Sequence, residues 1–80
     1  METYLVTFDL VEPAKNYSCV CAQLRRLRFA PLQPSAWAGA SDYEPELLKN
    51  NLLRCMQQDD RLLVFKFEIT DADYAAHNLM

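Results

Sequence analysis

Apolar and polar residues alternate along the first ten positions in the pattern of a β-strand. One face carries Tyr4, Val6, Phe8 and Leu10, and the other carries Leu5, Thr7 and Asp9. The period of two and the β-branched and aromatic content predict a strand over residues 3–10. Pro13 ends this strand, and Asn16 is a suitable N-cap for a helix that follows.

After this cap the apolar positions recur at intervals of three and four residues, which predicts a helix with one buried stripe. The stripe comprises Tyr17, Val20, Cys21, Leu24 and Leu27. Residues 29–40 are interrupted by prolines, which lack a backbone donor and allow only short or edge strands. We expect two such strands around Leu32 and Trp37, meeting near Pro34 and Ser35.

A second helix and a second long strand complete the pattern. Ser41 and Glu44 have the spacing of a capping box, and Pro45 falls in the first turn of the helix that they announce. The buried stripe of this helix comprises Leu48, Leu52, Cys55 and Met56. Residues 61–69 alternate again, with Leu63, Phe65, Phe67 and Ile69 on one face and Leu62, Val64, Lys66 and Glu68 on the other. This alternation predicts the last strand.

The order strand, helix, strand, strand, helix, strand indicates an α+β domain with the ferredoxin-like βαββαβ plan, an antiparallel four-stranded sheet with both helices on one face. The 80 residues are enough for one such domain, residues 1–80, and for no second core. The tail over residues 71–80 is too short to pack alone. The sequence leaves open whether this tail packs on a partner subunit.

The sheet face without helices is predicted to be an interface. Leu5, Leu62 and Val64 oppose the residues that we expect to face the helices. Uncovered apolar surface of this kind usually marks a contact with another chain. We therefore predict a homodimer formed through the open face or its edge, with these three residues at the dimer interface.

The cysteine content bears on the cellular compartment. Three cysteines are an odd number, which is typical of a reducing compartment where thiols stay free. Cys19 is interpreted as a free thiol, and Cys21 and Cys55 as small core residues. No apolar run approaches the roughly 20 residues that span a bilayer, and no leader pattern precedes the first strand. We expect a cytoplasmic protein without membrane contact.

The net charge of −3 argues against a protein whose whole surface binds nucleic acid, because such binding depends on many cations. Any contact with DNA or RNA must be local. The cationic candidates are Lys15, Arg25, Arg26 and Arg28. Planar guanidinium groups suit phosphate, although arginines in the last turn of a helix also complement its dipole and are commonly just solvated. Trp37 and Tyr43 can stack on bases if exposed, but Trp37 is more readily assigned to the core.

Three segments, in order along the chain, carry a pattern found in a known family. They are Tyr4-Leu-Val-Thr-Phe-Asp9-Leu10 followed by Pro13, Lys15, Asn16 and Tyr17; Ser35 with Trp37; and Asp60-Arg-Leu-Leu-Val64. Together they resemble the small ferredoxin-fold CRISPR adaptation protein, the non-integrase partner in spacer acquisition, and its stand-alone relatives. The chain departs from that pattern with Arg28 and Phe29 at the helix exit, where relatives usually have Gly.

The resemblance implies a symmetric homodimer in which Asp9 approaches its twin across the two-fold axis. In that family Mg²⁺ between the two carboxylates has been proposed to support phosphodiester hydrolysis, while other members are thought only to hold duplex DNA. Asp9 is therefore the candidate catalytic residue and magnesium ligand of an endonuclease acting in antiviral defence. The structural alternative is that Asp9 caps the turn before Pro13 by accepting backbone donors.

A competing hypothesis is a non-catalytic module that binds another protein. Its contact surfaces would be the acidic second helix, with Glu44 and Glu46, and the apolar sheet face. The partner would be a CRISPR integrase or a basic nuclease, and a role as adaptor, inhibitor or toxin–antitoxin component fits the same fold. The acidic net charge favours this view.

Overall fold

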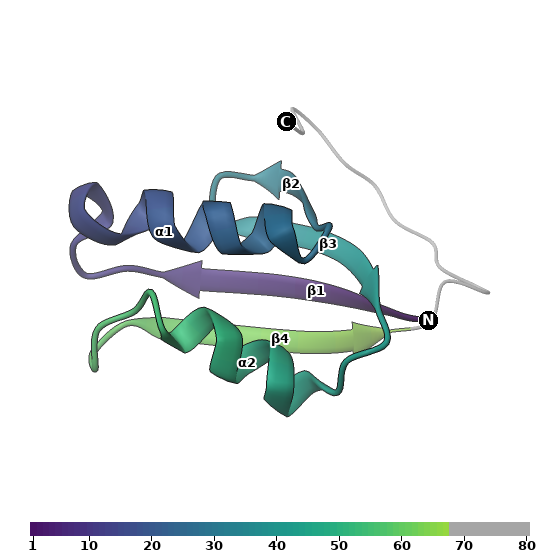
Figure 1. Cartoon of the computed structure of the whole chain (residues 1–80). Coiled ribbons are helices and arrows are strands. Elements are labelled where there is room, and N and C mark those ends of the chain that lie inside the picture. The colour runs from purple at the N-terminus through teal and green to yellow at the C-terminus, as the bar shows by residue number, and fades with distance from the viewer. Residues whose placement is uncertain (68–80) are drawn as a thin grey trace.

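The computed structural model describes residues 1–67, which form one sheet with two helices on one of its faces (Figure 1). The elements are β1 (Glu2–Asp9), α1 (Pro13–Arg26), β2 (Ala30–Gln33), β3 (Ala36–Ser41), α2 (Pro45–Leu53) and β4 (Arg61–Phe67). The four strands are antiparallel and lie in the order β2-β3-β1-β4. The ferredoxin-like prediction is confirmed. The last two residues predicted for the final strand, and the tail over residues 71–80, lie outside the described residues.

The core lies between the sheet and the two helices, as the apolar stripes predicted. From the central strand β1, Tyr4, Val6 and Phe8 are buried on the helix side. The buried side chains that meet them from the other elements are Val20, Cys21, Leu24, Phe29, Trp37, Leu48, Leu52 and Cys55. Trp37 is only 1% exposed, so its assignment to the core is confirmed.

Helix α1 begins at Pro13, earlier than the sequence predicted. Glu12 is its N-cap residue, and Pro13 occupies the first turn, where the missing backbone donor of proline has no intrahelical partner to lose. Asn16, predicted to be the N-cap, lies inside the helix. Its side-chain Nδ2 donates to the carbonyl oxygen of Cys55 at 2.9 Å, so it serves a tertiary contact instead of a cap.

Helix α1 ends in a Schellman-type turn with an arginine at the left-handed position. The Phe29 nitrogen donates to the Leu24 oxygen at 2.9 Å, and the Arg28 nitrogen donates to the Arg25 oxygen at 3.0 Å. Arg28 has φ 69°, a conformation that costs a residue with a Cβ about 1–2 kcal/mol. The chain thus keeps a long cation where glycine would fit without strain.

The single glycine lies where Phe29 packs on β3. A Cβ built on Gly39 would lie 2.8 Å from the Phe29 ring and 3.0 Å from its Cα. The close approach of Phe29 therefore excludes a β-branched residue from this position of β3. Because Gly39 has no Cβ, Phe29, which follows the strained Arg28, can pack in the core against β3.

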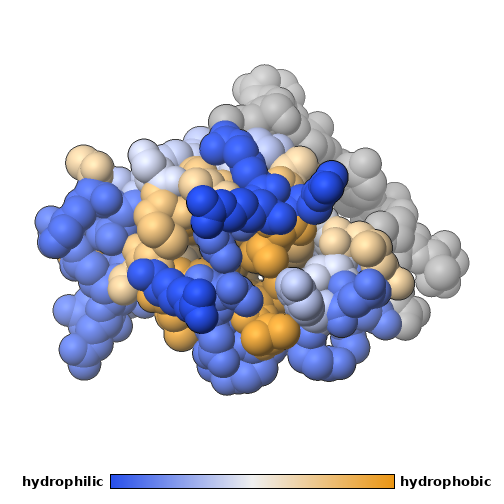
Figure 2. Space-filling view, viewed as in Figure 1, coloured by the Kyte–Doolittle hydropathy of each residue, from blue (hydrophilic) through white to orange (hydrophobic). Residues whose placement is uncertain are grey.

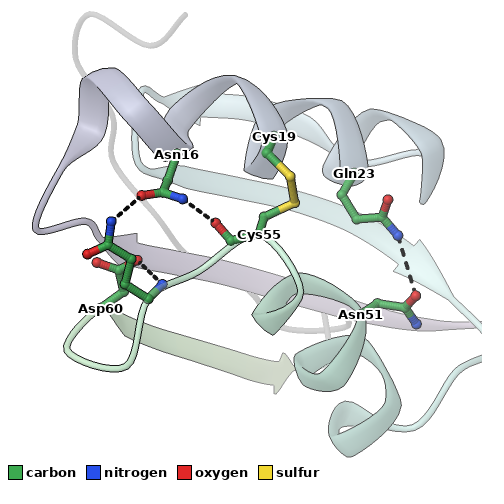
Figure 3. Close-up of a disulfide and its surroundings, with 7 residues drawn as sticks. Asn16, Cys19, Gln23, Asn51, Cys55 and Asp60 are labelled. Carbon is green, nitrogen blue, oxygen red and sulfur yellow. Dashed lines mark hydrogen bonds between the residues drawn. A yellow bond between two sulfur atoms is a disulfide. The ribbon is translucent and has the colours of Figure 1, made fainter.

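A disulfide between Cys19 of α1 and Cys55 just after α2 joins the two helical segments (Figure 3). The interpretation of Cys19 as a free thiol is therefore wrong, whereas Cys21 is a free, buried thiol. Cys55 is buried as predicted. Sequence spacing could not reveal the pair, because the two cysteines are 36 residues apart and meet only when the helices pack. Since disulfides are rare in reducing compartments, cysteine content no longer supports a cytoplasmic location.

The predicted faces of the last strand are exchanged. Val64 pairs with Val6 and Leu62 with Phe8, so both side chains lie on the helix side and pack against the core. Their assignment to the open face is wrong. Leu63, Phe65 and Phe67 point to the uncovered side instead. Alternation alone defines two sets of residues, and only the register with β1 decides which set faces the helices.

Candidate functional site

The uncovered face of the sheet carries exposed apolar side chains next to Asp9. Leu63 and Phe65 are 55% and 53% exposed, and their β1 neighbours across the strand pair are Thr7 and Leu5. Leu5, predicted to lie on this face, is there and is half-buried. By contrast, the helix side seen in Figure 2 is covered mainly by hydrophilic residues, with apolar groups visible between them. We call Leu5, Leu63, Phe65 and Phe67 the open-face strip.

Asp9 lies at the rim of this face, where β1 ends. It is exposed, and its cross-strand neighbour on β4 is Arg61. A shallow depression of about 220 Å³ lies here and is lined by Thr7, Phe8, Asp9, Arg61, Leu62 and Leu63. Within the described residues Asp9 and Arg61 form no ion pair shorter than 4.0 Å. Neither charge is therefore neutralised by the other in this part of the chain.

Asp60, and not Asp9, holds the turn after β1. Its Oδ1 accepts a hydrogen bond from the Val11 nitrogen at 2.7 Å, and its Oδ2 accepts one from the Gln57 nitrogen at 2.7 Å. Gln57 also donates to the Asn16 side chain at 3.1 Å, which links this turn to α1 (Figure 3). Within the described residues, the Asp9 side chain accepts no hydrogen bond that would cap the turn before Pro13, and Asp60 takes that role instead. The sequence singled out Asp60 only as part of the Asp60-Arg-Leu-Leu-Val64 segment, because its contact with Val11, 49 residues away, cannot be predicted from the local pattern.

A magnesium site at Asp9 needs a second copy of the chain. Among residues 1–67 no three His, Cys, Asp or Glu side chains gather in a way that could hold a metal ion. Mg²⁺ usually takes one or two carboxylates from the protein and keeps several waters. One Asp9 from each of two chains would supply that minimum. Arg61 beside each carboxylate could contact a phosphate oxygen on the same ion.

The structure separates the predicted catalytic residue from most of the predicted cations. Helix α1 runs back along β1, so Lys15 lies at the Asp9 end and the arginines lie at the other end (Figure 1). A helix of 14 residues spans about 21 Å. Arg25 is used within the fold, since its Cζ lies 5.2 Å from the centre of the Trp37 ring. Arg26 and Arg28 are exposed.

Arg26 and Arg28 line a cavity that is larger than the depression beside Asp9. This cavity has a volume of about 650 Å³. Its lining residues are Met1, Arg26, Leu27, Arg28, Ala40, Ser41, Asp42 and Tyr43. Tyr43, unlike Trp37, has an exposed side chain, at 49%. The sequence identified the two arginines and Tyr43 separately, but it gave no sign that one cavity collects them.

One titratable group near α1 is perturbed. The pKa of Tyr17 is raised above its ordinary value, first by a hydrogen bond with the Cys21 side chain and then by desolvation and the Cys21 charge, while Arg25 opposes the shift. The Tyr17 hydroxyl also donates to the Pro34 oxygen at 2.7 Å. The contact with Pro34 ties α1 to the β2–β3 turn, and the contact with Cys21 lies within α1. Both contacts stabilise the neutral phenol and point to a structural role.

Comparison with protein-family models finds no match, and comparison with curated proteins finds no significant similarity. Of the two helices that the structure describes, neither has the length and apolar character needed to cross a membrane. Function is therefore inferred from the geometry of the described residues.

Proposed function

We propose that the protein acts as a homodimer, formed through the open-face strip, that binds and scaffolds nucleic acid. The observation that supports this most directly is the position of the strip on the same sheet face as Asp9. A second copy that covers the strip would bring the two rims of the sheet toward one another. This is the arrangement that the resemblance to the CRISPR adaptation family implies.

A second copy suits this face for two reasons. The exposed aromatic and aliphatic side chains of Phe65 and Leu63 lie on β4, an edge strand whose outer backbone groups are unpaired within the described sheet. Asp9 and Arg61 lie side by side at the rim and carry opposite charges. In a two-fold interface each chain contributes the same patch, so this rim, with one acid and one base from each copy, adds no net charge to the interface.

Nucleic acid would be held by local cations, because the net charge is negative. Arg26 and Arg28 are the cations best placed for phosphate, and a dimer would present one such pair on each side of the two-fold axis. Lys15 lies nearer to Asp9 and would contact a strand that passes over the middle of the dimer. A cytoplasmic location belongs to the same proposal, because the nucleic acid would be found there.

Magnesium-dependent hydrolysis at Asp9 is a second, separable activity. It is favoured by the exposure of Asp9 beside Arg61 at the rim. When bound, Mg²⁺ would activate water and neutralise phosphate charge. Asp9→Asn should then abolish magnesium-dependent cleavage of DNA or RNA and leave the dimer intact. Unchanged cleavage by this variant would exclude Asp9 as the catalytic residue.

The dimer is tested by light scattering during size-exclusion chromatography. Phe65→Glu should convert the dimer to a folded monomer, because it places a charge in the apolar contact. Leu47→Glu is the matched control, since Leu47 is 47% exposed on α2 at the helix side. A wild-type monomer, or a dimer broken only by Leu47→Glu, contradicts the proposed interface. The latter outcome supports the competing hypothesis of a protein-binding surface on α2.

Nucleic-acid binding is tested by fluorescence anisotropy with labelled duplex DNA, single-stranded DNA and RNA across a salt series. Affinity should fall as salt rises, because phosphate contacts release counterions. The single variants Arg26→Ala and Arg28→Gly should each bind more weakly, and Arg54→Ala, which removes one positive charge elsewhere, should not. Absence of salt-dependent binding by the wild-type dimer rejects a nucleic-acid function and leaves binding to a protein, such as an integrase, as the alternative.

A further inference from the structure

The cavity at the end of α1 has features that a general basic surface does not need. Arg28 adopts a left-handed backbone conformation that glycine would adopt more easily, and two hydrogen bonds of the helix end hold it there. The strain is the same whatever the side chain beyond Cβ does. A guanidinium kept at a strained position that borders a cavity suggests that its charge is used there.

The two arginines of this cavity are not neutralised within the described part of the chain. Neither Arg26 nor Arg28 forms an ion pair with a described carboxylate, and the third arginine of the cluster lies over Trp37. Two neighbouring guanidinium groups are a good match for a phosphate that carries two negative charges. Their positive charge also exceeds the partial negative charge at the end of α1.

Tyr43 lines the cavity, and two hydrogen bonds hold its backbone. The backbone carbonyl oxygen of Tyr43 accepts a hydrogen bond from the Tyr4 hydroxyl at 2.7 Å, and the backbone nitrogen of Tyr43 donates to the Ser41 Oγ at 3.0 Å. Tyr4 is buried, and Ser41 is the buried polar residue of the described core. The backbone of Tyr43 is therefore held from both sides while its ring stays half exposed. A half-exposed aromatic ring on an anchored backbone suits stacking on a nucleobase.

We propose that this cavity binds a nucleotide that carries a terminal phosphate. Arg26 and Arg28 contact the phosphate, and the ring of Tyr43 stacks on the base. The Asp42 carboxylate, whose Oδ1 lies 3.7 Å from the Met1 amino group, accepts hydrogen bonds from sugar hydroxyls. A volume of about 650 Å³ lies within the range of small-molecule sites. The ligand chemistry is a phosphate monoester joined to a planar base, whether as a free mononucleotide or as the phosphorylated end of a strand.

If the bound nucleotide is the phosphorylated end of a strand, this inference rests on the proposed nucleic-acid function. If it is a free mononucleotide, the inference is independent of that function. The probes for calorimetry are AMP, adenosine and orthophosphate, and two copies of one oligonucleotide with either a 5′-phosphate or a 5′-hydroxyl group. AMP should bind at least about tenfold more tightly than adenosine, because adenosine lacks the charge-assisted contacts of the phosphate. Equal affinities for AMP and adenosine overturn the inference.

Variants separate the roles within the cavity. Arg28→Gly removes the guanidinium and relieves the strained backbone, so it should weaken AMP binding about tenfold or more without lowering the melting temperature. Tyr43→Ala should weaken AMP binding and leave orthophosphate binding unchanged. Arg54→Ala, whose side chain does not line the cavity, should match the wild type. Wild-type AMP affinity in Arg28→Gly overturns the inference even if that variant is more stable.

The oligonucleotides distinguish this inference from the proposed function. Tighter binding of the 5′-phosphorylated strand, lost in Arg28→Gly, supports both. Binding of AMP without binding of either oligonucleotide supports the cavity and rejects the scaffold. Equal binding of both oligonucleotides, with no competition by AMP, supports the scaffold and rejects the cavity.

Discussion

The two faces of the sheet use their apolar residues differently. On the helix side, Val6 and Trp37 are almost completely buried against α1 and α2. On the other side, Leu63 and Phe65 leave about half of their surface in solvent. The first set supplies most of the free energy of folding of a single chain, because hydrophobic stabilisation follows the apolar area removed from water. The second set contributes little until another surface covers it.

The largest effect is expected from a core truncation on the helix side. Leu24 is fully buried on α1, and Leu24→Ala should lower the free energy of unfolding by about 2–5 kcal/mol, since it leaves a cavity in the core. Urea denaturation followed by circular dichroism measures this loss. A loss below about 0.5 kcal/mol, the level typical of surface substitutions, would contradict the assignment of the core to this face.

The disulfide clamps the helical layer and should have the next largest effect. Its two cysteines are 36 residues apart, and closing a loop of that size typically contributes about 2–4 kcal/mol. Reduction should therefore lower the free energy of unfolding by about this amount, measured by urea denaturation with and without reductant. The double variant Cys19→Ala with Cys55→Ala is the control, and reductant should not change its stability. Alkylation of all three cysteines in the unreduced, unfolded chain would contradict the pairing.

Adjacent leucines on β4 test the two faces within one strand. Leu62 packs against the core and Leu63 is 55% exposed. Leu62→Ala should cost about 2 kcal/mol of unfolding free energy, because its site is only partly buried. Leu63→Ala should stay within about 0.5 kcal/mol in the monomer, while weakening the proposed dimer. The reverse order of the two losses, measured below the dimer dissociation constant, would show that the register of β4 is wrong.

The smallest effect is expected from alkaline titration of Tyr17. Because its pKa is raised in the folded chain, chiefly by the hydrogen bond with Cys21, the neutral phenol favours folding. The unfolded chain releases this proton first, so the contribution is complete below the ordinary pKa of 10.0 and is lost as the pH rises above it. Unfolding free energies measured across this range should fall with pH. Tyr17→Phe should make the fall less steep, and an unchanged slope would contradict the assignment.

Local pattern was a good guide to the elements of this fold and a poor guide to their exact contacts. The stripe of α1, the short strands on either side of Pro34 and the order of elements follow from periodicity and turn residues, whereas α2 ends at Leu53, before Cys55 and Met56 of its predicted stripe. The start of α1 was misplaced because Asn16 has the chemistry of a cap but is used for a contact with Cys55. A residue type shows which contacts it can make, and the packing of distant segments selects among them.

The candidate sites divide in the same way. Asp9 was predicted at the end of a strand from its neighbours alone, and it is exposed there. Its position beside Arg61, the burial of Leu62 and Val64, and the pairing of Cys19 with Cys55 depend on strand register and helix packing. The cavity that collects Arg26, Arg28 and Tyr43 depends on the return of β3 beside the end of α1.

The order of hydrophobic and polar residues along the chain was enough to specify the βαββαβ fold and its helix stripes, because periods of two and 3.6 residues are local properties of the backbone. The choice of the face that stays open, and of the charged groups that meet at each end of the sheet, required the assembled fold. A shift of one residue in the pairing of β4 would exchange every side chain between the two faces, and nothing in the alternation of that segment prevents it.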